Sequence, residues 1–169
     1  MSKIILCAMD KEADNVLVPN ACIYITGIGC INVIKTLSRL IKRGEITSKD
    51  EIINVGYAGS SNLPIGSVVT INKCSRLNAS TTVKEPTFKL KKAEGLDFFE
   101  CKTADDFIEK YNGKKVIDME LAYICSFFSK VTSIKIISDN ENYCEYEEFD
   151  SKESWKTVNK ILKGIINAD

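Results

Sequence analysis

The chain has 169 residues, 44% apolar and 27% charged, so we expect one globular domain spanning residues 1–169. Its 23 basic and 23 acidic side chains cancel, which argues against the positive surface that nucleic-acid binding requires. Because the sequence contains no histidine, Ser–His and Cys–His nucleophile systems are excluded, and acid–base chemistry must use carboxylates, Lys, Tyr or Cys.

The first part of the chain alternates strand-like and helical patterns. Apolar runs predict strands at residues 3–9, 22–26, 51–55 and 67–71. Between the second and third of these strands, apolar side chains recur at helical spacing over residues 30–43, which predicts an amphipathic helix. The turn Gly27-Ile28-Gly29 opens this helix. It could hold an anion or a sugar hydroxyl on free backbone amides, or its glycines could serve packing alone.

The second part of the chain has a less regular start and a clear end. Residues 72–95 are polar and lysine-rich, which predicts a loop or an irregular hairpin. The elements that we expect after it are a strand at 96–101, a short helix from Thr103 to near Gly113, a strand at 116–117 that runs into a helix, a strand at 132–138, an acidic loop at 141–150 and an amphipathic helix at 152–166.

Glycine turns or acidic residues follow five of these strands. If the sheet is mostly parallel, such strand ends converge along one edge, where ligands bind. Asp118 and Glu120 also have a simpler interpretation, as a cap and a favourable charge at a helix start. The converging segments are Met9-Asp10-Lys11-Glu12, Gly27-Ile28-Gly29, Gly56-Tyr57-Ala58-Gly59, Asp118-Met119-Glu120 and Ser138-Asp139.

These segments resemble, in order, the motifs of the purine nucleoside phosphorylase and uridine phosphorylase superfamily. The similarity is greatest to its methylthioadenosine/S-adenosylhomocysteine nucleosidase branch, in a shortened form. The matching pieces are Ala8-Met9-Asp10-Lys11-Glu12, Thr26-Gly27-Ile28-Gly29 with Asn32, Asn54-Val55-Gly56-Tyr57-Ala58-Gly59, Ile65-Gly66-Ser67-Val68-Val69, Ala104-Asp105-Asp106-Phe107-Ile108, Asp118-Met119-Glu120-Leu121-Ala122 and Ile137-Ser138-Asp139. The resemblance implies a three-layer α/β/α fold around a mixed, mostly parallel twisted sheet.

The resemblance also implies hydrolysis of the N-ribosyl bond of a purine nucleoside, a reaction of purine nucleoside metabolism and methionine salvage. Asp139, oriented near Ser138, would protonate the purine at N7, and Glu12 would activate the attacking water. For the substrate, the resemblance assigns ribose hydroxyls to Glu120, the sugar face to Met119, stacking on the purine to Phe107, and further contacts to Ser138, Ala58 and Gly59. It implies no cofactor, and a homodimer.

Three features depart from the family pattern. The segments between Glu12 and Gly27 and between Ile71 and Phe107 look trimmed. Tyr57 replaces a small residue and could fill the nucleophile site. Lys135 stands where an arginine is usual, and a lysine keeps the charge but loses the planar fork of donors.

The departures leave alternatives open. One is a phosphorylase that uses phosphate instead of water, although the three arginines form no phosphate-binding constellation. Another is a degenerate member that binds a nucleoside without cleaving it. The simplest is a structural α/β domain without a site.

The seven cysteines form no CxxC pair, which predicts neither a zinc site nor a redox motif. We expect reduced cysteines in a cytoplasmic protein. The start of the sequence does not resemble a signal peptide, and no apolar run is long enough for a membrane span.

Overall fold

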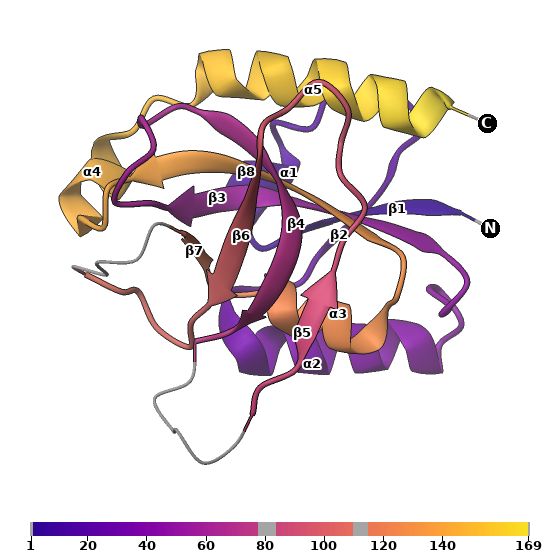
Figure 1. The fold of residues 1–169 in the computed structure, drawn as a ribbon. Coiled ribbons are helices and arrows are strands. Elements are labelled where there is room, and N and C mark those ends of the chain that lie inside the picture. The colour runs from indigo at the N-terminus through magenta and orange to yellow at the C-terminus, as the bar shows by residue number, and fades with distance from the viewer. Residues whose placement is uncertain (1, 78–83, 110–114, 169) are drawn as a thin grey trace.

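The computed structural model describes residues 2–77, 84–109 and 115–168. Within them, strands form one mixed sheet with helices on both faces, as Figure 1 shows. The strands are β1 Lys3–Cys7, β2 Cys22–Ile25, β3 Glu51–Gly59, β4 Val68–Arg76, β5 Thr87–Lys89, β6 Phe98–Thr103, β7 Val116–Asp118 and β8 Val131–Asp139. The helices are α1 Asp10–Ala13, α2 Gly29–Lys42, α3 Leu121–Phe127, α4 Tyr143–Glu148 and α5 Lys152–Asn167.

The sheet is mostly parallel, as predicted. The parallel pairs are β1–β2, β1–β3, β3–β8, β4–β6 and β6–β7, and the antiparallel pairs are β3–β7, β4–β5 and β4–β8. Five strands close on themselves, because β3 pairs with β8, β8 with β4, β4 with β6, β6 with β7, and β7 again with β3. This closed ring brings the ends of β3, β7 and β8 to one place.

The two faces of the sheet bury separate apolar clusters because successive strand residues point to opposite sides. In β1, Ile4 and Leu6 pack with α2 and α3, whereas Ile5 and Cys7 pack with α5. Figure 1 shows α5 on one face and α2 and α3 on the other. The layered α/β/α architecture and both long amphipathic helices therefore agree with the prediction.

Several predicted boundaries were wrong. Gly56-Tyr57-Ala58-Gly59 is not a turn, because β3 continues through Gly59 and pairs with β8 along this stretch. Glu12 lies in the short helix α1, which the pattern did not indicate. Residues 104–109 form no helix, so no helix begins at Thr103, and residues 110–114 lie outside the described part.

Two predicted loops contain regular structure. Residues 72–76 continue β4, and β5 pairs with it antiparallel, so the hairpin interpretation was correct there. The segment 141–150 contains α4, which has no buried residue and therefore no apolar periodicity to reveal it. None of the helices that the structure describes is long and apolar enough to cross a membrane.

Candidate active site

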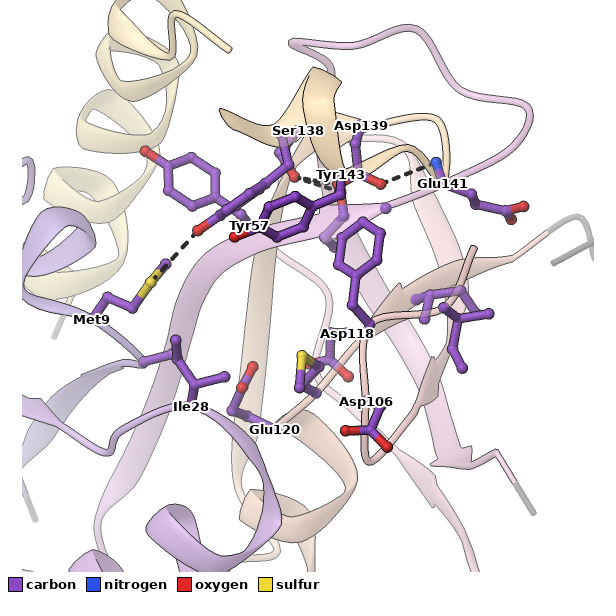
Figure 2. Close-up of a pocket in the computed structure, with 18 of the residues that line it drawn as sticks. Met9, Ile28, Tyr57, Asp106, Asp118, Glu120, Ser138, Asp139, Glu141 and Tyr143 are labelled. Atoms are coloured by element: carbon purple, nitrogen blue, oxygen red, sulfur yellow. Dashed lines mark hydrogen bonds between the residues drawn. The ribbon is translucent and has the colours of Figure 1, made fainter. Parts of the chain in front are cut away.

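A cavity of about 290 Å³ lies where β1, β3, β7 and β8 end. Figure 2 shows the side chains that surround it. Its wall contains all eight residues that the sequence assigned to a site: Glu12, Ala58, Gly59, Phe107, Met119, Glu120, Ser138 and Asp139. The wall also contains Ala8, Met9, Ile28, Tyr57, Asp106, Ile108, Ile117, Asp118, Glu141, Tyr143 and Tyr146.

Glu12 is held rigidly at this wall, with only 2% of its surface exposed. Its Oε2 accepts the backbone N–H groups of Ala8 (2.7 Å) and Met9 (3.1 Å), which lie before α1. Its Oε1 accepts the N–H of Tyr57 in β3 at 2.9 Å. Burial raises the pKa of Glu12, while these hydrogen bonds and the charge of Lys135 act in the opposite direction.

Asp139, the last residue of β8, is buried to the same degree. Its Oδ2 accepts the hydroxyl of Ser138 at 2.7 Å, and its Oδ1 accepts the N–H of Glu141 at 3.0 Å. Burial raises the pKa of Asp139 even though both hydrogen bonds favour the ionised form. A buried carboxyl of this kind can hold a proton closer to neutrality than an exposed aspartate.

Two glycines of β3 make room for these two carboxylates. A methyl carbon on Gly56 would lie 2.6 Å from Oε1 of Glu12, and one on Gly59 would lie 2.7 Å from Oδ1 of Asp139. The pairing register of β3 and β8 shifts between Ala58 and Gly59, and such irregularities redirect side chains at functional edges. Three residues of strand span about 10 Å, so β3 sets the separation between the two carboxylates.

Glu120 does not cap its own helix. It lies at the start of α3, but its Oε1 accepts the N–H of Gly29, the first residue of α2, at 2.9 Å. The glycine turn therefore binds an anion from within the chain. Burial, followed by the nearby Asp118, raises the pKa of Glu120 to about 7. Glu120 occupies the N-cap position of α3, where the simpler interpretation placed a favourable charge, but its carboxylate joins two segments of the cavity wall.

Asp118 is not the N-cap residue of α3, because Glu120 holds that position, but its carboxylate binds the first N–H of the helix. Its Oδ2 accepts the N–H of Leu121 at 2.9 Å, and its Oδ1 accepts the hydroxyl of Thr103 at 2.6 Å. Lys135 in β8 forms an ion pair with Oδ2 at 2.8 Å, and both side chains are almost completely buried. Burial alone would lower the pKa of Lys135, but the carboxylates of Asp118 and Glu120 raise it, so the ammonium keeps its charge.

Tyr57 lies on the cavity wall, where its filling of the nucleophile site stays a prediction, but its hydroxyl bonds to residues at α5. The hydroxyl lies 2.9 Å from Oγ of Ser151 and accepts the indole N–H of Trp155 at 3.0 Å. The ring makes edge contacts with Trp155, Phe149 and Tyr146. The side chain thus fastens β3 to α5, while its backbone N–H holds Glu12.

Aromatic side chains form another part of the wall. Phe107 and Tyr143 meet edge to face with ring centroids 5.5 Å apart, and Tyr143 comes from α4. Tyr143 and Tyr146 were not predicted as site residues, and the only indication of them was their place in a tyrosine-bearing acidic segment. Among the residues that the structure describes, no group of three or more candidate ligands is arranged to hold a metal ion.

No protein-family model and no curated protein matches the chain. Solved structures do match it closely in fold. The MTA/SAH nucleosidase of Streptococcus pneumoniae, solved with 8-aminoadenine, is 18% identical, with a TM-score of 0.80 and 100% of both chains covered. The 5'-methylthioadenosine/S-adenosylhomocysteine nucleosidase of Helicobacter pylori is 17% identical, with a TM-score of 0.78 and 99% of this chain and 98% of that chain covered.

The futalosine hydrolase of Helicobacter pylori is 16% identical, with a TM-score of 0.76 and 98% of this chain and 97% of that chain covered. These matches extend over nearly the whole of each chain. The shortening expected between Glu12 and Gly27 and between Ile71 and Phe107 stays a prediction. The chain has the fold of the purine nucleoside phosphorylase and uridine phosphorylase superfamily, with nucleosidases as its structural neighbours.

Proposed function

We propose that the protein hydrolyses the N-ribosyl bond of a purine nucleoside of the 5'-methylthioadenosine/S-adenosylhomocysteine type and releases the base. One observation carries the proposal: two buried carboxylates, Glu12 and Asp139, lie against two glycines of one strand and face a single cavity. Cleavage of a glycosidic bond through an oxocarbenium-like transition state needs an acid for the leaving group and a base for the nucleophile.

Asp139 is the proposed acid. Burial raises the pKa of its carboxyl, so it keeps a proton to higher pH than an exposed aspartate, and that proton passes to N7 of the purine as the bond to the sugar breaks. The electron pair of the broken bond then remains on a neutral base instead of an anion. The hydroxyl of Ser138, 2.7 Å from Oδ2, fixes the orientation of the acid.

Glu12 is the proposed base. Three backbone N–H groups hold its carboxylate, so it needs no reorientation when it accepts a proton from water. The oxygen of that water forms the new bond to the anomeric carbon. An acid and a base placed in this way each contribute about 10²–10⁴-fold to the rate.

The remaining residues of the wall suit the substrate. The N–H of Gly29 donates to Oε1 of Glu120, and we propose that Oε2 accepts a ribose hydroxyl. Met119 offers an apolar surface to the sugar, and Phe107 offers a ring to the purine. Ala58 and Gly59 allow close approach of the substrate because they carry little or no side chain.

Two observations support this substrate class and water as the nucleophile. The Helicobacter pylori nucleosidase was solved with butyl-thio-DADMe-Immucillin-A, and a mutant of it was solved with 5'-methylthioadenosine in the active site. In this chain, the N–H of Gly29 at the start of α2, a position suited to a phosphate, already donates to the carboxylate of Glu120.

We further propose a homodimer, and a cytoplasmic location that agrees with seven unpaired cysteines.

The deciding experiment measures base release from 5'-methylthioadenosine, S-adenosylhomocysteine, adenosine and inosine, with and without phosphate. We expect free sugar and free base at a rate independent of phosphate. Formation of a ribose 1-phosphate would establish the phosphorylase alternative instead. Thermal stabilisation by a nucleoside without any base release would establish the alternative of a binding protein that has lost catalysis.

A further inference from the structure

We infer that Tyr123 and Arg76 are positioning residues for the purine side of the cavity. They hold Asp105 and, through it, the ring of Phe107. This inference rests on the proposed function, in which Phe107 contacts the base. Neither Tyr123 nor Arg76 is among the wall residues that the structure describes, so each acts only through the segment that it holds.

The segment that carries Phe107 has no regular structure of its own. Residues 104–109 form no helix or strand, and Phe107 is 36% exposed and belongs to neither buried apolar cluster. The segment starts at the end of β6, where the N–H of Ala104 donates to the carbonyl oxygen of Asp118 at 2.8 Å. Figure 2 shows Asp106, the neighbour of Phe107, on the same side of the cavity as Asp118. Contacts made by side chains must fix the rest of the segment.

Asp105, two residues before Phe107, makes such contacts through both of its carboxylate oxygens. Its Oδ1 accepts the hydroxyl of Tyr123, and its Oδ2 accepts a guanidinium N–H of Arg76 at 3.3 Å. The guanidinium of Arg76 also lies over the ring of Tyr123, 5.3 Å from the centroid. The three side chains therefore form one closed network, in which each contact supports the other two.

Within this network Tyr123 is the stronger holder of Asp105. Arg76 and Asp105 are both partly exposed, and ion pairs in contact with water contribute little. Tyr123 is only 6% exposed, and its hydroxyl donates to a charged group, which strengthens a hydrogen bond. Burial, followed by the hydrogen bond to Asp105, raises the pKa of Tyr123, so the hydroxyl keeps its proton and remains a donor.

Tyr123 also links the purine side of the cavity to the sugar side. Glu120 is at the N-cap position of α3, and its carbonyl oxygen accepts the N–H of Tyr123 at 3.0 Å. One hydrogen-bonded turn thus carries both the carboxylate that we assign to the ribose and the hydroxyl that holds Asp105. Tyr123 therefore sets the place of Phe107 relative to the bound sugar.

Three substitutions test this arrangement with a matched control. Tyr123→Phe removes one hydroxyl and keeps the buried ring. Asp105→Ala removes both contacts of the carboxylate, whereas Asp105→Asn keeps an oxygen for the hydroxyl of Tyr123 and loses the ion pair with Arg76. Tyr24→Phe is the control, because Tyr24 lies in β2, outside the described wall, and its hydroxyl also has a glutamate partner, Glu45.

The first measurement separates binding of the base from binding of the sugar. It determines kcat and KM for 5'-methylthioadenosine, and the dissociation constants of adenine and of 5-methylthioribose. In Tyr123→Phe we expect the KM and the dissociation constant of adenine to rise about 10-fold, while kcat and the dissociation constant of the sugar stay within about twofold. Asp105→Ala should lose at least as much, Asp105→Asn should lose clearly less than Asp105→Ala, and Tyr24→Phe should lose nothing.

A double variant shows whether Tyr123 acts through Phe107. Phe107→Leu removes the aromatic ring and should itself weaken the binding of adenine. If Tyr123 only holds that ring, adding Tyr123→Phe to Phe107→Leu causes no further loss. A further loss of about 10-fold in the double variant would overturn the inference, as would an equal loss of adenine and sugar binding in Tyr123→Phe.

A last measurement separates the inference from the proposed function. 4-Fluorophenylalanine placed at position 107 alone reports the surroundings of that ring through its fluorine resonance, without any ligand. Tyr123→Phe and Asp105→Ala should shift or broaden this resonance, and Tyr24→Phe should not. If the unchanged protein neither cleaves 5'-methylthioadenosine nor binds adenine, the proposed function fails and the resonance decides: a changed signal in Tyr123→Phe supports the inference, and an unchanged one overturns it.

Discussion

The carboxylate of Glu12 occupies the space where a side chain on Gly56 would begin, because a methyl carbon there would lie 2.6 Å from Oε1. Gly56→Ala must therefore push the carboxylate away from the N–H of Tyr57, which it accepts at 2.9 Å. We expect a loss of at least about 100-fold in kcat, measured by base release, because the proposed base is displaced.

Gly164→Ala is the control for this substitution. Apart from Gly164, its two chain neighbours and the nearby backbone of helix α5, no atom of the described residues lies within 4 Å of the position of its added carbon. The control should keep full activity and gain about 0.5–1 kcal/mol of stability, since alanine favours a helix over glycine. Normal turnover by Gly56→Ala would show that the position of Glu12 does not matter for the reaction.

The role of Gly56 illustrates what sequence patterns could and could not predict. Apolar runs predicted strands because their residues alternate between the two buried clusters, and apolar residues at helical spacing predicted the two long helices, each of which packs with one cluster. The order of the acidic and glycine segments predicted which residues share a cavity. That Gly56 and Gly59 lie inside β3, and not in a turn, depends on carboxylates that arrive from α1 and β8, so local propensity could not reveal it.

Other failures have a different physical origin. Helix α4 buries no residue and so lacks an apolar stripe. The ion pair of Lys135 with Asp118 joins residues 17 positions apart through the fold, and an isolated lysine in a strand pattern does not specify its partner. From the sequence, Glu120 could be a favourable charge at a helix start or a residue that binds the sugar, and the sequence could not reveal its bond to the N–H of Gly29.

Ser138→Ala should change the pH dependence of the reaction more than its maximum rate. The hydroxyl of Ser138 donates to Asp139 at 2.7 Å and lowers the pKa of that carboxyl. Its removal therefore raises the pKa of Asp139, which keeps the proposed acid protonated to higher pH. In a plot of kcat/KM against pH, the alkaline limb should therefore shift to higher pH.

Asp139→Asn is the companion variant. It preserves the shape of the side chain but cannot transfer the proton, so we expect a loss of kcat of about 10²–10⁴-fold. The variant should still bind a purine nucleoside, which a shift in its melting temperature would measure. An unchanged rate in Asp139→Asn would assign the proton transfer to another group and remove the basis of the Ser138 prediction.

Glu120 should make the protein less stable as the pH rises toward neutrality. Its pKa is about 7 in the folded protein and near the ordinary value of about 4.3 in the unfolded chain, so the folded state binds more protons between these values. Stability therefore falls from about pH 4 to about pH 7 and changes no further above that through this group. Glu12 and Asp139 act in the same direction.

Comparison of Glu120→Gln with the unchanged protein isolates the contribution of Glu120. Glutamine keeps an oxygen for the N–H of Gly29 but does not ionise in this range. Urea unfolding at pH 5 and pH 8 should show a loss of stability that is smaller in Glu120→Gln, by on the order of 1 kcal/mol or more. Parallel pH dependence in both proteins would contradict the raised pKa.

The buried ion pair of Lys135 and Asp118 should be costly to break from one side and less costly to remove entirely. Lys135→Met leaves the carboxylate of Asp118 buried without its cation, and we expect a loss of about 3–5 kcal/mol in the free energy of unfolding. Asp118→Asn leaves the ammonium unpaired but keeps an oxygen for the N–H of Leu121, so it should destabilise by a similar amount. In the double variant no charge of the pair remains, and asparagine still offers an oxygen to the N–H of Leu121. Its loss of stability should therefore be clearly smaller than the sum of the two single losses. Urea unfolding of the three variants measures this coupling, and simple additivity would mean that the two side chains do not interact in solution.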